Sequence, residues 1–154
     1  MTGSKPDTGC VFCTPRPGSG QAAEDSLVLF SGTTCFVVLN LYPYNNGHLM
    51  VVPYRHVASL SALTDEELQE MARLTQRSEA AVTEAYQPHG LNVGINLGKP
   101  AGAGVLDHIH VHVVPRWNGD TNFMTVVGEV RVLPEELGET VKRLRPIFVR
   151  LSGL

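Results

Sequence analysis

Half of the six histidines of this 154-residue chain stand at alternate positions in one short segment, HIHVHVV (residues 108–114). In a β-strand, side chains two residues apart point to the same face and stand about 6.5–7 Å apart. We therefore expect His108, His110 and His112 to line one face of a strand. Such a face can simply be polar and exposed to solvent. Three neutral imidazoles in register are also suited to bind a metal or to attack an electrophile.

A glycine-rich segment, GKPAGAG (residues 98–104), lies just before the histidines. Glycines let backbone N–H groups turn inward around a phosphate, although the same composition also suits a tight connection. Next to a row of imidazoles, the segment favours a phosphate group as the electrophile. The net charge of −3 gives no broad attraction for nucleic acid or an anionic membrane, so local groups must hold any anionic ligand. No apolar run reaches the roughly 20 residues of a membrane span.

Two of the three cysteines, Cys10 and Cys13, form a CVFC motif, and the third, Cys35, lies in an apolar run. The odd count and the lack of an apolar secretory leader argue against a disulfide framework and favour the cytoplasm. In a reducing compartment, CxxC is typical of half a zinc site or of a redox pair, and its place in an irregular arm disfavours the redox pair. Zinc then needs two further ligands, which histidines commonly supply.

Local patterns locate the elements that must position these groups. Apolar and β-branched runs predict strands at 26–30, 35–41, 48–53, 90–96 and 108–114, and the turn-forming YPYNNG (42–47) predicts a hairpin between the second and third. Thr64 and Glu67 form a capping-box pattern, which begins a helix that should end before Pro88. A second helix is expected from Pro134 to about Arg145, because a proline follows at position 146.

These elements predict an α+β fold, with a mainly antiparallel sheet of about five strands, one long crossover helix and a C-terminal helix. Hydrophobic residues make up 43% of the chain, which is ample for a core. No repeat or linker divides the sequence. We therefore expect a single domain, 1–154, in which residues 1–25 form an irregular arm that carries the CxxC.

The HIHVHVV segment fits the pattern H-φ-H-φ-H-φ-φ, where φ is apolar, and so resembles the signature of the histidine triad (HIT) superfamily of nucleotide hydrolases and transferases. The resemblance also includes CVFC, FVVLNLYPYNNGHLMVVPYRH, LTDEE, VGINLGKPAGAG and HVVPRWNGDTNF, and covers roughly residues 10–123. It is closest to a bacterial branch that includes diadenosine polyphosphate hydrolases and phosphorylases. The resemblance thus implies a HIT-like fold.

The resemblance also implies a two-step nucleotidyl transfer. His110 would attack the α-phosphate of a dinucleoside polyphosphate such as diadenosine tetraphosphate and form a covalent nucleotidyl-histidine, which water or phosphate then releases. The other groups implied to contact the nucleotide or its phosphates are Asn40, Asn96, Gly104 and His112. The segment before the first histidine is one residue longer than in eukaryotic members, which leaves the phosphate-binding backbone group open, with Gly104 as the candidate. Trp117 would stack on a base or pack against a partner subunit.

For the metal, the resemblance adds His56 and His108 to Cys10 and Cys13 as a closed, structural zinc site. It assigns His48 to orienting the triad and leaves His89 as a solvated loop residue. It further implies a homodimer that pairs across the long helix and the strand after it. The alternatives are a nucleoside phosphoramidase of the same superfamily, a non-catalytic zinc and nucleotide-binding module, and a metallohydrolase in which all three histidines bind one metal.

Overall fold

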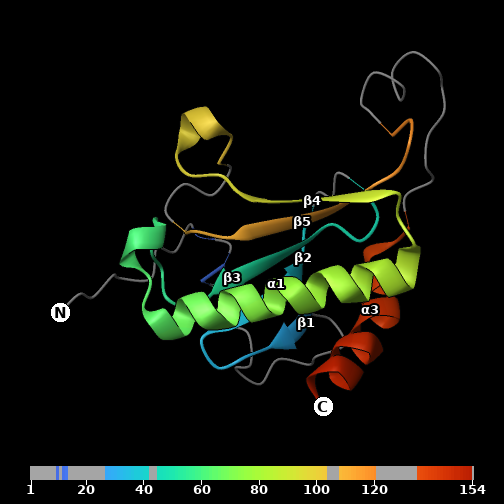
Figure 1. The fold of residues 1–154 in the computed structure, drawn as a ribbon, viewed down its shortest axis with the longest axis horizontal. Helices are drawn as coiled ribbons and strands as arrows, with labels where there is room; N and C mark the ends of the chain where they lie inside the picture. The colour runs from blue at the N-terminus through green and yellow to red at the C-terminus, as the bar shows by residue number, and fades with distance from the viewer. Residues whose placement is uncertain are drawn as a thin grey trace.

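The computed structural model of the chain describes residues 10, 12–13, 27–41, 45–103, 108–120 and 135–153. Within them lies one antiparallel sheet in the order β1-β2-β3-β5-β4 (Figure 1). Its strands are β1 (Val28–Ser31), β2 (Cys35–Leu39), β3 (Leu49–Pro53), β4 (Gly90–Ile95) and β5 (Val111–Arg116). The hairpin predicted around residues 42–47 is confirmed, because β2 and β3 pair from Cys35 with Pro53 to Leu39 with Leu49.

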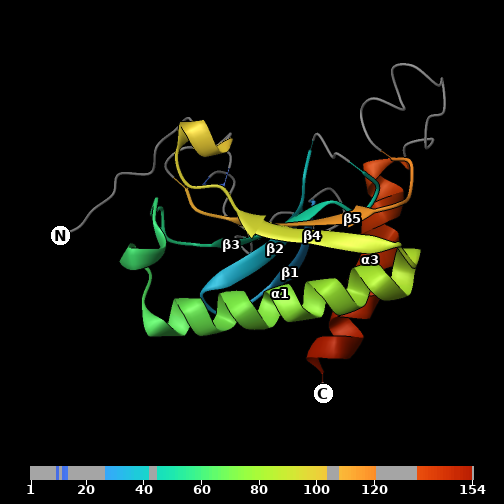
Figure 2. The same cartoon turned by 45° about the horizontal axis from the view of Figure 1, so that its top comes forward.

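Two helices, α1 (Asp65–Tyr86) and α3 (Leu137–Ser152), cover one face of the sheet (Figure 2). Alternate strand residues point toward them and form the main core. In β2 these are Cys35, Val37 and Leu39, which are buried together with Leu144 and Phe148 of α3. Since α1 connects β3 to β4, it is the long crossover helix that the sequence predicts. The α+β fold class is confirmed.

The opposite face of the sheet carries a second, smaller apolar cluster. Strand residues Phe36, Met50 and Val52 are buried there with Cys10 and Phe12 of the N-terminal arm. The arm residues that the structure describes thus pack against the sheet on the side away from the helices. His112 pairs with Met50 in the β3–β5 register and shares this face.

The capping box of α1 is present as predicted. The Thr64 hydroxyl accepts a hydrogen bond from the Glu67 backbone N–H, and the Thr64 backbone N–H donates to the Glu67 carboxylate. The helix ends at Tyr86, and Gln87 adopts a left-handed backbone conformation before Pro88. No helix among the described residues is long and apolar enough to cross a membrane.

The prediction of the C-terminal helix was wrong about where the helix ends. Pro134 lies outside the described residues, and α3 begins at Leu137, but it continues through Pro146 to Ser152. A proline inside a helix removes one hydrogen bond and costs about 3 kcal/mol. Phe148, which is fully buried in the main core, offsets that cost, since burial of a large apolar side chain contributes roughly 1.5–3 kcal/mol. Ile147 and Leu151 pack against the same core.

The histidine strand also differs from the prediction. β5 begins at Val111, so His108 and His110 precede the strand, and the Ile109 N–H donates to the carbonyl of Val57. The predicted alternation nevertheless holds, because Ile109, Val111 and Val113 are all buried in the main core. The histidines do not form an exposed polar row: His108 is 0% exposed and His110 4%.

Candidate active site and metal centre

The backbone holds His110 in one tautomer. Its Nδ1–H donates to the carbonyl oxygen of His108 at 2.8 Å. The lone pair of the ring is therefore on Nε2, which is the form of imidazole that attacks an electrophile. Burial lowers the pKa of His110, so the ring is neutral near pH 7.

His112 and His48 continue a row of neutral rings beside His110. The His110 and His112 ring centroids are 4.7 Å apart, and the His112 Nδ1 lies 3.0 Å from the Nε2 of His48, a hydrogen-bond distance. Burial, together with the neighbouring histidines, lowers the pKa of both His48 and His112 to about 4. The Asn40 amide nitrogen lies 3.3 Å from the same His48 Nε2. Asn40 is thus placed beside the histidine row.

The loop that carries His48 is tied to two other parts of the chain. Asn45 donates to the Pro115 carbonyl at 2.8 Å and to the Asp120 carboxylate at 2.7 Å, and the Asn46 side-chain oxygen accepts from the Glu135 N–H. Asp120 also receives the Trp117 N–H and two hydrogen bonds from the Arg116 guanidinium, which lowers the pKa of that carboxyl.

Sequence reasoning missed the Asn45–Asp120 link. The pattern YPYNNG predicted the turn that contains Asn45. Nothing in that pattern indicates that the turn contacts the segment after β5.

All four predicted metal ligands converge. The ligand atoms of Cys10, Cys13, His56 and His108 all lie within 4.8 Å of one another. The Nδ1 of His108 is 3.4 Å from the Cys10 sulfur, 3.6 Å from the Cys13 sulfur and 3.2 Å from the His56 Nδ1. A zinc tetrahedron with ordinary Zn–S and Zn–N bonds has edges of about 3.3–3.8 Å. The donor set and the spacing therefore fit zinc with little rearrangement.

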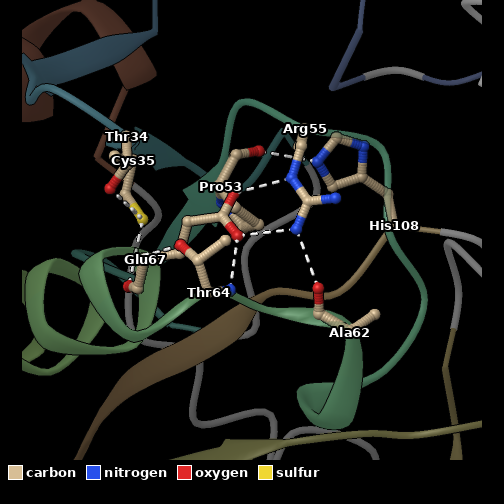
Figure 3. Close-up of polar contacts among 8 residues, drawn as sticks. All are labelled: Thr34, Cys35, Pro53, Arg55, Ala62, Thr64, Glu67 and His108. Atoms are coloured by element: carbon tan, nitrogen blue, oxygen red, sulfur yellow. Dashed lines mark hydrogen bonds and ion pairs between the residues drawn. The ribbon is translucent and has the colours of Figure 1, made fainter. Parts of the chain in front are cut away.

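Groups outside the cluster orient His108 and hold the residue next to His56. The His108 Nε2–H donates to the Pro53 carbonyl at 2.8 Å, which leaves Nδ1 as the ligand nitrogen (Figure 3). His56 follows Arg55, whose guanidinium donates to both oxygens of the Glu67 carboxylate and to the Ala62 carbonyl (Figure 3). The residue next to His56 is thus fixed to the N-terminus of α1.

The glycine-rich segment forms a compact turn around the short 3-10 helix Lys99–Ala101. Gly98 and Gly102 have φ of 81° and 95°, which glycine adopts readily. The N–H groups of Ala101 and Ala103 donate to the Gly98 carbonyl, and that of Gly102 to the Lys99 carbonyl. These three amides donate hydrogen bonds within the turn. Gly104 lies outside the described residues.

The other residues that the sequence singled out lie outside the histidine row and the metal cluster. Asn96 is half-buried at the end of β4, and its amide nitrogen faces Gly102, where an added β-carbon would approach to 3.8 Å. His89 is exposed, and its Nδ1 accepts from the Asn118 N–H. Trp117 is half-buried. Cys35 is buried, and burial raises its thiol pKa to about 11, as suits an inert core residue.

Comparisons with known proteins agree with this architecture. The family model described as "HIT domain" matches residues 21–119. The chain is 49% identical over 127 residues to an "AP-4-A phosphorylase" of Mycobacterium tuberculosis, covering 82% of this chain and 65% of that protein. It is 32% identical over 131 residues to a "Bis(5'-adenosyl)-triphosphatase" of Dictyostelium discoideum, covering 81% of this chain and 87% of that protein.

A solved structure extends the similarity to three dimensions. A Zn-bound histidine triad family protein from Mycobacterium smegmatis superposes with a TM-score of 0.71 and 29% identity, over 94% of this chain and 96% of that one. The M. tuberculosis relative is longer than this chain, which spans 65% of its length.

Proposed function

Because this chain belongs to the HIT family, we propose that it is an enzyme that cleaves a dinucleoside polyphosphate at the α-phosphate through a nucleotidyl-histidine. The observation that carries this proposal is the tautomer and neutral charge of the His110 ring. Its Nδ1–H is bound to a backbone carbonyl, so the neutral ring carries its lone pair on Nε2, the atom that would act as the nucleophile. The names of two relatives, a phosphorylase and a triphosphatase of diadenosine polyphosphates, support this class of substrate.

The reaction has two displacements at phosphorus. The His110 Nε2 forms a bond to the α-phosphorus while the bond from that phosphorus to the bridging oxygen breaks, and the remaining nucleotide leaves with that oxygen. Water or inorganic phosphate then attacks the same phosphorus, releases His110 and gives a mononucleotide or a nucleoside diphosphate. His112, 4.7 Å from His110 between ring centroids, is placed to stabilise the phosphoryl oxygens or the leaving oxygen.

We assign substrate contacts to the residues around this pair. Asn40 would contact the ribose hydroxyls, and its position beside His48 supports that role. Asn96 and Gly104 would contact phosphate oxygens. His48 would orient His112 through the 3.0 Å contact between their ring nitrogens.

The same nucleophile would serve a nucleoside phosphoramidase, which differs in the leaving group. The 49% identity to an AP-4-A phosphorylase favours the polyphosphate. A non-catalytic nucleotide-binding module would not need the tautomer that the His108 carbonyl imposes on His110. A metallohydrolase that uses all three triad histidines is disfavoured, because the His108 Nδ1 faces Cys10 and Cys13 rather than the other two rings.

We also propose that Cys10, Cys13, His56 and His108 bind a structural zinc ion. Four protein ligands leave no open position for substrate, so the ion would hold the arm against the sheet. The thiols must stay reduced to bind the metal, which fits the proposed cytoplasmic location. Mass spectrometry of the purified protein should find one zinc per chain, and Cys13→Ser should lower that content. A zinc-free parent protein would contradict the assignment.

The decisive experiment incubates the protein with diadenosine tetraphosphate and with a nucleoside phosphoramidate, each with and without inorganic phosphate. Hydrolysis gives mononucleotide, phosphorolysis gives nucleoside diphosphate, and a phosphoramidase acts on the second substrate alone. His110→Asn should lower kcat by at least roughly 10³-fold, because the covalent route is lost, while mononucleotide binding persists. His89→Asn, which changes an exposed histidine outside the site, is the matched control. Activity retained in His110→Asn would contradict the mechanism.

A further inference from the structure

Phe12 connects the cysteine–histidine cluster to the proposed nucleophile. It lies in the sequence between Cys10 and Cys13, and its ring centroid is 5.4 Å from that of His108 and 5.0 Å from that of His110. The edge-to-face angle to His108 is 71°, and the tilt to His110 is 56°. One aromatic ring therefore contacts both a proposed metal ligand and the proposed nucleophile.

The position of Phe12 depends on its two neighbouring cysteines. The Cys13 N–H donates to the Cys10 carbonyl at 3.1 Å, which closes a tight turn with Phe12 inside it. Both cysteine sulfurs point at the His108 Nδ1. A metal bound by both sulfurs would fix the turn at both ends, and with it the direction of the Phe12 side chain.

The ring also covers part of the nucleophile. Phe12 is 8% exposed within the apolar cluster on the helix-free face, and His110 is 4% exposed. The single hydrogen bond at Nδ1 fixes one edge of the His110 ring and does not by itself prevent the ring from tilting. Contact with Phe12 restrains that tilt and keeps water from the covered part of the ring.

We propose that Phe12 is a positioning residue through which the metal centre acts on His110. In the metal-bound protein the cysteines hold the Phe12 ring against the imidazole. When the metal is lost the turn loosens, the ring withdraws, and His110 becomes mobile and exposed. This coupling rests on the proposed zinc binding. Through it, the metal would determine the position and exposure of His110 as well as hold the arm against the sheet.

The test measures how fast diethylpyrocarbonate modifies His110, by tandem mass spectrometry that distinguishes this residue from His108 and His112 in the same peptide. It uses the parent protein and Phe12→Ala, each with zinc bound and after zinc removal by a chelator, at one pH at which the imidazoles are neutral. Removing zinc from the parent should speed the modification of His110 by roughly tenfold, since a local opening must expose the ring. Phe12→Ala should show the fast rate with zinc bound, and zinc removal should add little.

Two controls separate positioning from general loosening. The modification rate of exposed His89 serves as the reference for reagent activity in every sample. Phe36→Leu is compared with Phe12→Leu, because Phe36 belongs to the same apolar cluster but stacks on Tyr54, at 5.3 Å between centroids. Phe12→Leu should raise the rate at His110 and Phe36→Leu should leave it unchanged.

Three outcomes would overturn the inference. The His110 rate in zinc-bound Phe12→Ala could equal that of the zinc-bound parent. Zinc removal could speed the reaction equally in both proteins, so that the metal acts by another route. Both Phe12 variants could fail to bind zinc, which would make Phe12 part of the metal centre's own support. The assay needs no turnover, so its result is independent of whether the chain cleaves diadenosine tetraphosphate.

Discussion

At the scale of single residues, the structure explains why position 47, just before His48, is a glycine. Its φ is +82°, and an added β-carbon would lie 2.9 Å from the Cε2 of the Tyr86 ring. Either feature alone disfavours a side chain, and together they require glycine. The close approach to Tyr86 fixes the loop against the end of α1, and so fixes the backbone from which His48 reaches His112.

Gly47→Ala should therefore destabilise the protein more than an ordinary left-handed glycine would. The backbone conformation costs about 1–2 kcal/mol for a non-glycine residue, and the clash with Tyr86 adds to it. Gly119→Ala is the matched control, because Gly119 has φ +83° and nothing within 4 Å of an added β-carbon. Urea unfolding of both variants gives the two free energies of unfolding. Equal losses would show that the Tyr86 contact is unimportant.

The buried histidines predict how stability depends on pH. The pKa of His48 and of His112 falls to about 4 in the folded protein, from 6.5 for a free histidine. The unfolded chain binds protons first as the pH falls, so the free energy of unfolding should decrease from about pH 6.5 downward to about pH 4. Unfolding in urea at several pH values measures this slope. His112→Asn should flatten it between pH 6.5 and 4.5, and an unchanged slope would contradict the assignment.

At the scale of elements, the N-terminus of α1 is joined to the metal side of the sheet through Glu67. The buried Glu67 carboxylate caps the helix by accepting the Thr64 N–H, and it also pairs with Arg55 beside His56 (Figure 3). The Arg55 hydrogen bonds and the Thr64 backbone N–H lower the pKa of Glu67. One side chain thus positions both the helix and the turn that carries a proposed zinc ligand.

Glu67→Gln should cost about 2 kcal/mol, because the amide keeps one acceptor oxygen but loses the charged pair with Arg55. Thr64→Ala removes only the cap and should cost about 1 kcal/mol. Glu139→Gln, in an exposed pair with Lys142, is the control and should change little. Chemical denaturation measures all three. Chelator competition should also show weaker zinc binding in Glu67→Gln than in Thr64→Ala, and equal affinity would contradict the link to His56.

At the scale of the whole molecule, β4 lies at one edge of the sheet within the described chain. Val93 on this strand is 48% exposed and Leu97 beyond it 43%. Unprotected edge strands with apolar side chains pair readily with a second chain. We therefore retain the homodimer, formed across α1 and the strand after it, β4, as a proposal.

Val93→Lys tests that proposal, because a charge on the edge strand opposes pairing between chains. Light scattering after size-exclusion chromatography should give twice the chain mass for the parent and a single chain mass for the variant. Lys142→Val, on the exposed surface of α3, is a control that should not change the mass. A monomeric parent protein would contradict the dimer.

The features that the sequence predicted correctly are those encoded by residues close together in the chain. The capping box needs only Thr64 and Glu67, and the β2–β3 hairpin needs two apolar runs around a turn. The burial of Ile109, Val111 and Val113 follows from alternation alone. The resemblance to a known family, and not the local pattern, identified the four residues of the cysteine–histidine cluster. No periodicity in the sequence could show that His56 lies beside Cys13.

Only the tertiary structure decided the features that depend on distant contacts. Burial of Phe148 carries α3 through Pro146 against local preference, and the Val57 carbonyl takes the Ile109 N–H before β5 begins. Cys10 meets His108 across 98 positions of sequence. The sequence by itself determined which side chains alternate and where most of the elements begin. Tertiary packing decided which elements and side chains contact each other. A contact between residues far apart in the sequence forms only when every element that positions them is in place.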